Sequence, residues 1–146
     1  MNINQWNQQG GVYVWSYLGN PKNHTGWHMT CDEAGCTSIA ELADLAQNSI
    51  TDSKRTINIT HPSNNELRVP NCKAKATAPK KLVFSYAKGA PEAWEIYLEN
   101  DKLFLSLGEN YLEQFKRGIL DISQGNGDYS IGTEGQELWF WWRVSG

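Results

Sequence analysis

Alternating hydrophobic and polar residues predict β-strands along most of this chain. Strands are expected at 12–18, 27–30, 54–61, 82–87, 94–99, 102–107, 128–131 and 137–144. Most of these segments repeat apolar or β-branched residues with the period of two that a strand requires. Glycine and proline residues separate many of these segments. The pair Asn100–Asp101 predicts a turn that joins 94–99 and 102–107 into a hairpin.

A period nearer four predicts two helices. The first is expected to begin at the capping box Ser38–Glu41, whose two side chains satisfy backbone amides of the first turn, and to run to about Ile50. The second is expected over 109–117, with Gly118 near its end. Each helix has one apolar face, so each is expected to pack by one side only.

These elements predict an α+β fold. About seven strands and two helices, joined mainly by turns, indicate a mostly antiparallel sheet in a single compact domain, 1–146. Residues 1–10 are polar and are expected to fray or to run over the surface. Three prolines interrupt strand pairing across 62–81, which is predicted to be a loop with at most a short extended piece at 67–69.

The last expected strand is the bulkiest. If it is extended, the run from Leu138 to Val144 puts Trp139 and Trp141 on one side and Phe140 on the other. Two bulky faces predict either a central strand covered on both sides or a face held for a partner.

Composition excludes some classes of function. The 146 residues carry a net charge of −3, so the overall balance does not favour nucleic-acid binding. No apolar run is long enough to span a bilayer, and the polar start has neither the basic nor the apolar region of a signal peptide. We therefore expect no membrane association and a cytoplasmic location. Seven tryptophans offer large, rigid contact surfaces for a core or an interface.

The three cysteines are too few for a disulfide framework. Cys31, Cys36 and Cys72 are an odd number, which favours free thiols in a reducing compartment. A bridge between Cys31 and Cys36 is the alternative outside the cell.

One short segment gathers potential metal ligands. His24, His28, Cys31 and Cys36 form the pattern H-x3-H-x2-C-x4-C, and zinc prefers four such N and S donors. There is no C-x2-C pair, so buried thiols and surface histidines are expected in place of a metal or another cofactor. His28, Cys31 and Asp32 are also the candidates for nucleophilic catalysis, but their spacing matches no nucleophile motif, and we expect no catalytic residues.

These observations favour binding over catalysis. The candidate binding residues are Trp15, Trp139, Trp141, His28 and Cys31. We predict a non-enzymatic module that binds a protein partner or itself, with a homodimer among the possibilities. Small acidic immunity or inhibitor proteins for secreted toxins provide a class analogy only.

Two other functions remain open at this point. The first is a small-molecule-binding protein or enzyme with a pocket between 24–36 and 62–81. The second is carbohydrate binding through exposed tryptophans, which requires an aligned aromatic row on a solvent face.

Overall fold

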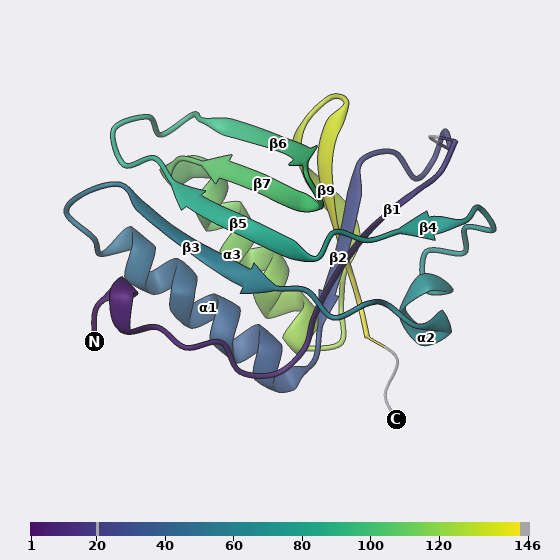
Figure 1. Cartoon of the computed structure of the whole chain (residues 1–146), viewed down its shortest axis with the longest axis horizontal. Helices are drawn as coiled ribbons and strands as arrows, with labels where there is room; N and C mark the ends of the chain where they lie inside the picture. Colours follow the sequence, from purple (N-terminus) through teal and green to yellow (C-terminus); the bar gives the residue numbers. More distant parts are fainter. Residues whose placement is uncertain (20, 144–146) are drawn as a thin grey trace.

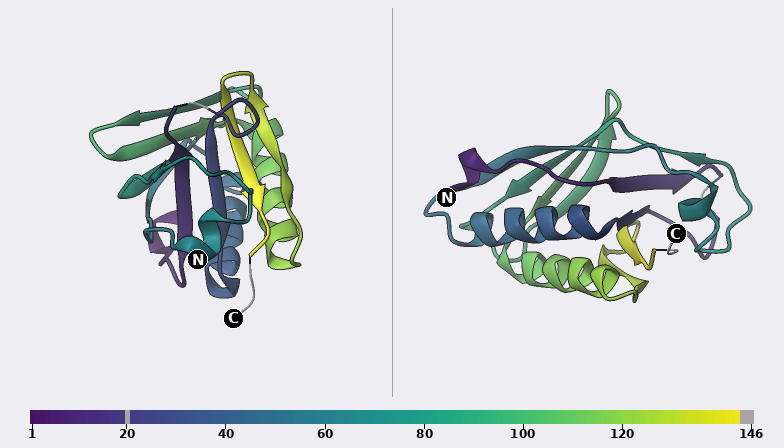
Figure 2. Two further views of the ribbon diagram at one scale, coloured as in Figure 1. Left: turned by 90° about the vertical axis from the view of Figure 1, so that its right-hand side faces the viewer. Right: turned by 90° about the horizontal axis from the view of Figure 1, so that it is seen from below.

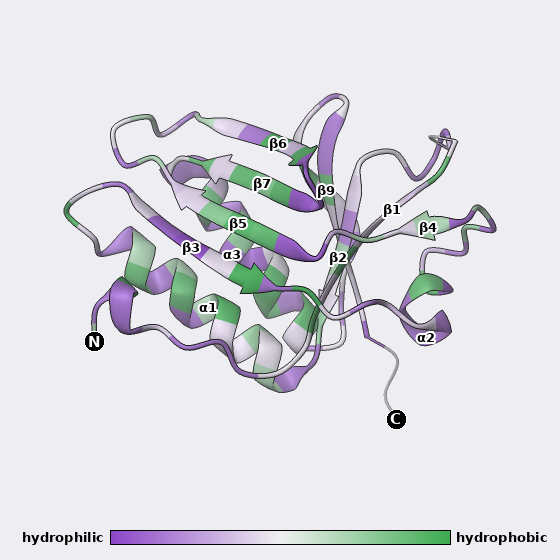
Figure 3. Cartoon of the chain, viewed as in Figure 1, coloured by the Kyte–Doolittle hydropathy of each residue, from purple (hydrophilic) through white to green (hydrophobic). Residues whose placement is uncertain are grey.

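The chain folds into two β-sheets packed against a pair of helices (Figure 1). The computed structural model describes residues 1–19 and 21–143, so Val144 at the end of the expected last strand lies outside the described residues. Seen from below, α1 and α3 lie side by side with the sheets above them (Figure 2). In Figure 3 the apolar segments concentrate in β5, β7 and along α1.

The elements come in a simple order along the chain. A 3-10 turn (Ile3–Gln5) precedes β1 (Val12–Tyr17), β2 (Trp27–Cys31), α1 (Glu33–Gln47), β3 (Ser53–Asn58), α2 (Asn64–Leu67), β4 (Ala76–Thr77), β5 (Lys81–Tyr86), β6 (Trp94–Glu99), β7 (Lys102–Leu107), α3 (Glu109–Ser123), β8 (Asp128–Thr133) and β9 (Gln136–Trp141). One sheet has the order β4-β1-β2-β9-β8, and the other has the order β3-β5-β7-β6.

The prediction of a compact α+β domain is confirmed, but the strands form two sheets. Both sheets are mixed, because β2 pairs with β9 and β5 pairs with β7 in parallel. The other described pairings are antiparallel, such as β6 with β7 and β8 with β9. Turn residues predict which neighbours form hairpins, whereas the parallel pairs join strands distant in sequence and leave no local signal.

Both long helices differ from their predicted bounds: α1 begins at Glu33, before Ser38, and ends at Gln47, before Ile50. Asp32 caps α1 by accepting a hydrogen bond from the Gly35 amide at 2.7 Å, so Ser38 lies inside the helix. Helix α3 continues past Gly118 to Ser123. A Cβ atom at residue 118 would lie 2.6 Å from the Phe140 ring, so this glycine allows close packing and does not end the helix.

The N-terminal segment runs along the surface and is anchored there. Trp6 is buried and donates its indole N–H to the Ser38 carbonyl at 2.8 Å. The Gln8 side chain bonds both backbone groups of Asn58, at 2.9 and 2.7 Å. The Gln8 side chain therefore covers part of the outer edge of β3. An uncovered edge strand could pair with a strand of another chain.

Residues 62–81 contain regular structure that the sequence analysis did not predict. Ser63 and Glu66 form a capping box for α2, and β4 pairs with β1. Leu67 ends α2, so the extended piece expected at 67–69 is absent from this described segment. The S-x-x-E pattern at residue 63 was a usable signal for the helix.

Strand β9 lies between β2 and β8, which agrees with the central-strand interpretation. Leu138 and Phe140 join the main core, whereas Trp139 and Trp141 join a second, smaller core on the other face. No helix in the described ranges is long and apolar enough to cross a bilayer.

Candidate functional site

Four of the candidate residues, Trp15, His28, Trp139 and Trp141, lie together on one face of the five-stranded sheet. We call these four residues the aromatic face. Trp15, His28 and Trp139 occupy opposed positions in neighbouring strands, which aligns their side chains across the sheet. The His28 ring stacks between the other two, with ring centres 5.9 Å from Trp15 and 6.1 Å from Trp139. Trp141 stacks on Trp139 at 5.6 Å.

His28 is a neutral structural residue within this stack. It is 0% exposed, and burial lowers its pKa to about 4. An indole N–H can only donate, so the 2.9 Å bond from Trp141 Nε1 makes His28 Nδ1 an acceptor. The proton therefore lies on Nε2, which donates to the His24 carbonyl at 3.0 Å. The expectation of a surface histidine is wrong for His28.

Residues 62–81 cover the aromatic face. Burial raises the pKa of Tyr17 to about 12, so its hydroxyl stays protonated and donates to the Leu67 carbonyl at 3.0 Å. His24 Nε2 donates to the Pro70 carbonyl at 2.7 Å. Small and medium-sized apolar side chains complete this second core: Leu67, Val69, Cys72, Ala74, Ala76 and Ala78.

The covering segment shields three tryptophans, Trp15, Trp139 and Trp141, from solvent. Trp142, at 40% exposure, is the most exposed of the seven tryptophans, which all lie in the described ranges, and the other six are buried or partly buried. The aligned, solvent-facing aromatic row that carbohydrate binding requires is therefore missing from the described part of the chain.

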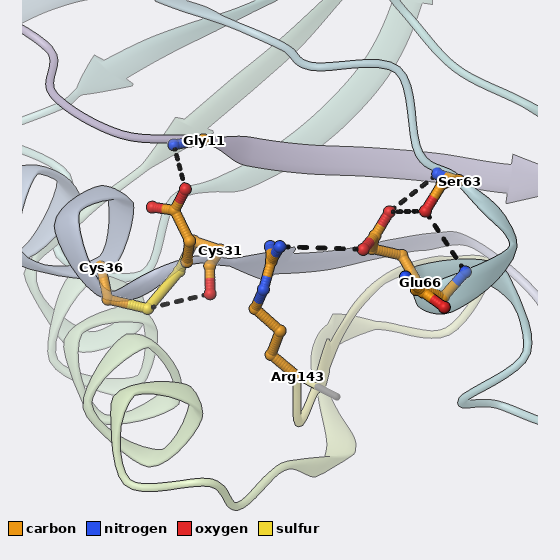
Figure 4. Close-up of polar contacts among 8 residues, drawn as sticks. Gly11, Cys31, Cys36, Ser63, Glu66 and Arg143 are labelled. Atoms are coloured by element: carbon orange, nitrogen blue, oxygen red, sulfur yellow. Dashed lines mark hydrogen bonds and ion pairs between the residues drawn. A yellow bond between two sulfur atoms is a disulfide. The ribbon is translucent and has the colours of Figure 1, made fainter. Parts of the chain in front are cut away.

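A polar network fastens residues 62–81 to one end of the aromatic face (Figure 4). The Arg143 guanidinium lies 4.9 Å from the centre of the Tyr13 ring and 4.0 Å from Glu66 Oε2. Glu66 is 6% exposed and accepts hydrogen bonds from the Ser63 amide and hydroxyl at 2.7 and 2.8 Å. The network therefore joins Arg143, two residues after the end of β9, to α2.

Three buried polar atoms over this face lack a hydrogen-bond partner among the described residues. They are Trp15 Nε1, Thr30 Oγ1 and Arg143 Nη1. Thr30 lies opposite Tyr13 in the sheet, and Arg143 lies over the Tyr13 ring. Buried N–H and O–H groups normally have a partner, either protein or water. Each of these atoms can therefore pair with a water or with another small polar group.

Cys31 and Cys36 form a disulfide, so the prediction of free thiols is wrong for this pair. The bridge joins the last residue of β2 to the start of α1, with Cα atoms 5.5 Å apart (Figure 4). Both residues are buried, and Cys72 remains a free thiol. Because disulfides persist in oxidising compartments, the cysteines no longer argue for a reducing one.

The segment from His24 to Cys36 does not form a metal site. Its two sulfur atoms are joined to each other, and His28 has both ring nitrogens bonded. Within 1–19 and 21–143, no three His, Cys, Asp or Glu side chains are grouped so that they could hold a metal ion.

A hollow of about 460 Å³ lies between α1 and α3, and we call it the helical groove. Its lining residues are Cys36, Thr37, Ala40, Glu41, Asp44, Leu45, Ile119, Leu120 and Ser123. Leu120 is 54% exposed, and Ala40 and Leu45 are partly buried. The groove therefore offers an apolar floor to solvent, which is a common property of interaction sites.

Side-chain bonds close the helical groove at one end. Lys116 of α3 pairs with Asp44 at 2.7 Å and bonds to Gln47 at 2.8 Å, and Gln47 also bonds to Glu113. From this network toward Cys36, the facing side chains are small, including Ala40 and Ser123. They leave the space between the two helix surfaces unfilled.

The α1 side of the groove is acidic. This helix carries Glu33, Glu41 and Asp44 and has no Lys or Arg. Asp44 is paired, whereas Glu33 and Glu41 are exposed and have no ion pair with any described residue. A second hollow of about 450 Å³ borders the other side of α1 and shares Thr37 and Glu41 with the helical groove. Glu41 therefore lies between two hollows.

Sequence reasoning missed this groove because part of its lining lies outside both predicted helices. Cys36 and Thr37 precede the predicted start at Ser38, and Leu120 follows the predicted end at Arg117. Asp32, a good N-cap residue three positions before Gly35, was the available signal for the earlier start.

Comparison with protein-family models, curated proteins and solved structures found no match to this chain.

Proposed function

We propose that this protein is a non-enzymatic binding module that recognises a protein partner through the helical groove. The observation that carries the proposal is the open apolar floor, in which Leu120 is 54% exposed beside the unpaired carboxylate of Glu41. An apolar floor with a polar rim is the usual composition of a protein interface.

The candidate catalytic side chains support binding over catalysis because their reactive atoms are already engaged. Cys31 is in a disulfide, and His28 uses both ring nitrogens inside the aromatic face. An immunity- or inhibitor-type role fits the same surface as a class analogy.

Photo-crosslinking in cells of the source organism tests the proposal. A photoreactive benzoylphenylalanine replaces Leu120 in the groove or, as the matched control, Ile50, which is 90% exposed and lies outside it. We expect one adduct of defined mass at residue 120 and none at residue 50. The substitution Ala40→Phe, which fills the groove, should abolish the adduct.

The outcomes separate the possible occupants. An adduct of twice the chain mass would identify a second copy as the partner. Equal labelling at residues 50 and 120, no adduct at residue 120, or an adduct that persists in Ala40→Phe would overturn the groove as the binding surface.

A small polar ligand beneath residues 62–81 is a second candidate function. The unpartnered Trp15 Nε1, Thr30 Oγ1 and Arg143 Nη1 favour it, since each can donate a hydrogen bond to a ligand oxygen. Native mass spectrometry of the purified protein should then show a mass above that of the chain, and Thr30→Val should remove it. A mass equal to the chain alone would contradict this second function.

A further inference from the structure

We infer that the partner segment bound in the helical groove is a basic amphipathic helix, an inference that rests on the proposed function. Its apolar side chains would cover Ala40, Leu45 and Leu120, and its Lys or Arg side chains would pair with Glu33 and Glu41. This is the helix-in-groove mode of recognition, in which apolar residues at i, i+3, i+4 and i+7 enter an apolar groove.

The shape of the groove suits a helix. α1 and α3 each contain 15 residues and therefore extend about 22 Å. The close pairing of Lys116 at 2.7 Å with Asp44 marks one end of the available length. Toward the other end, Thr37 and Glu41 form a ridge of α1 that borders the groove on one side and the second hollow, beside Glu33, on the other. A partner helix of about three turns can therefore lie along α1 while contacting both hollows.

The charge of the groove selects a basic partner. Glu33 and Glu41 are exposed and unpaired among the described residues, and α1 supplies no positive side chain. The last turn of α3, beside Leu120 and Ser123, has no basic residue, and the C-terminal end of a helix carries partial negative charge. Arg117 lines a separate hollow with β8. An acidic segment would therefore be repelled.

Positive charge in this chain is concentrated away from the groove, in residues 54–88. Residues 54–88 contain eight Lys and Arg side chains and a single Glu. The net charge of −3 therefore conceals an acidic α1 and a strongly basic segment that covers the aromatic face and forms β3 and β5. A partner that responded only to net charge would not distinguish these surfaces.

A defined peptide tests the chemistry. The probe is a synthetic helix of about 15 Leu, Ala and Lys residues with Leu at helical spacing, and the comparison peptide has Glu in place of every Lys. Binding to the full chain is measured by fluorescence anisotropy and mapped by amide NMR shifts. We expect the Lys peptide to bind at least about tenfold more tightly, to weaken with salt, and to shift amides of α1 and α3.

Matched variants distinguish the groove from the rest of the surface. Glu41→Lys should weaken Lys-peptide binding about tenfold, whereas Glu99→Lys, an exposed acid on β6 with the same charge change, should alter it less than about twofold. Leu120→Asp should weaken binding about tenfold, and Ile50→Asp should leave it unchanged. Circular dichroism confirms that each variant is folded.

Several results would overturn the inference. If Glu41→Lys and Glu99→Lys weakened binding of the Lys peptide equally, the net charge of the protein would explain the binding. If the amide NMR shifts were confined to β3 and β5, the peptide would bind outside the groove. No binding by the Lys peptide, or equal binding by the Glu peptide, would also contradict it. If one of these results occurred and the photo-crosslink at residue 120 still formed, the partner would not be a basic helix. The groove would still be the binding surface.

Discussion

The aromatic face and the helical groove differ in what their side chains do. The aromatic face holds large residues, yet His28 and Trp15 are fully buried beneath 62–81. The helical groove is built from small, acidic and aliphatic residues, and one of its aliphatic side chains, Leu120, is open to solvent. The most conspicuous residues in the sequence therefore form a core, and inconspicuous ones line the solvent-exposed groove.

The difference shows how burial decides the role of a residue type. A tryptophan side chain offers a large contact area in a core or at an interface. When another segment of the chain buries that area, the contact stabilises the fold. Alanine at residue 40 attracts no attention in the sequence, yet its small side chain leaves space in the groove between two helices. Three predictions test the contrast, in order of expected effect.

The largest effect is expected from truncating the aromatic face. Trp15→Ala should lower the free energy of unfolding by about 3 to 5 kcal/mol, because it removes a fully buried side chain and leaves a cavity. Leu120→Ala in the groove should lower it by less than about 1 kcal/mol, because that side chain is already half exposed. Urea denaturation measures both. Equal losses would remove the distinction between core and surface.

The second prediction concerns pH and His28. Its pKa is about 4 in the folded protein, below the unperturbed value of about 6.5, because burial disfavours the charged ring. The unfolded chain therefore binds the proton first as the pH falls. This contribution to stability is complete above pH 6.5 and is lost between about 6.5 and 4, with a size of roughly 3 kcal/mol.

A substitution isolates the contribution of His28. His28→Gln should show a smaller loss of stability than the wild type between pH 7 and 4 in urea denaturation. His61→Gln, at an exposed histidine, serves as the control and should follow the wild type. If His28→Gln keeps the full pH dependence, the protonation of His28 does not limit the stability of the aromatic face.

The smallest of the three effects is expected at the disulfide, which borders the helical groove. Reduction, or Cys31→Ser with Cys36→Ser, should lower the free energy of unfolding by about 2 kcal/mol, because the bridge closes only a short loop. Cys72→Ser provides the matched control at the free thiol. A drop as large as that of Trp15→Ala would show that the start of α1 is as important to the fold as the aromatic face.

Local patterns predicted the individual elements well and their ends poorly. The alternation in 94–99 and 102–107 gave the hairpin of β6 and β7, since both strands and their turn are continuous in sequence. Gly118 was interpreted as a helix end because glycine usually marks one, but its role is close packing against Phe140. The groove forms between two helices that are distant in sequence, so it could not be predicted from the local patterns alone.

The sequence by itself determined the α+β class and the two bulky sides of the last strand, because these depend on periodicity along a continuous segment. Only the tertiary structure decided that β9 pairs in parallel with β2, that residues 62–81 cover Trp139 and Trp141, and that Leu120 faces a groove. Each of these depends on segments distant in sequence, and their pairing is fixed by packing in the folded chain.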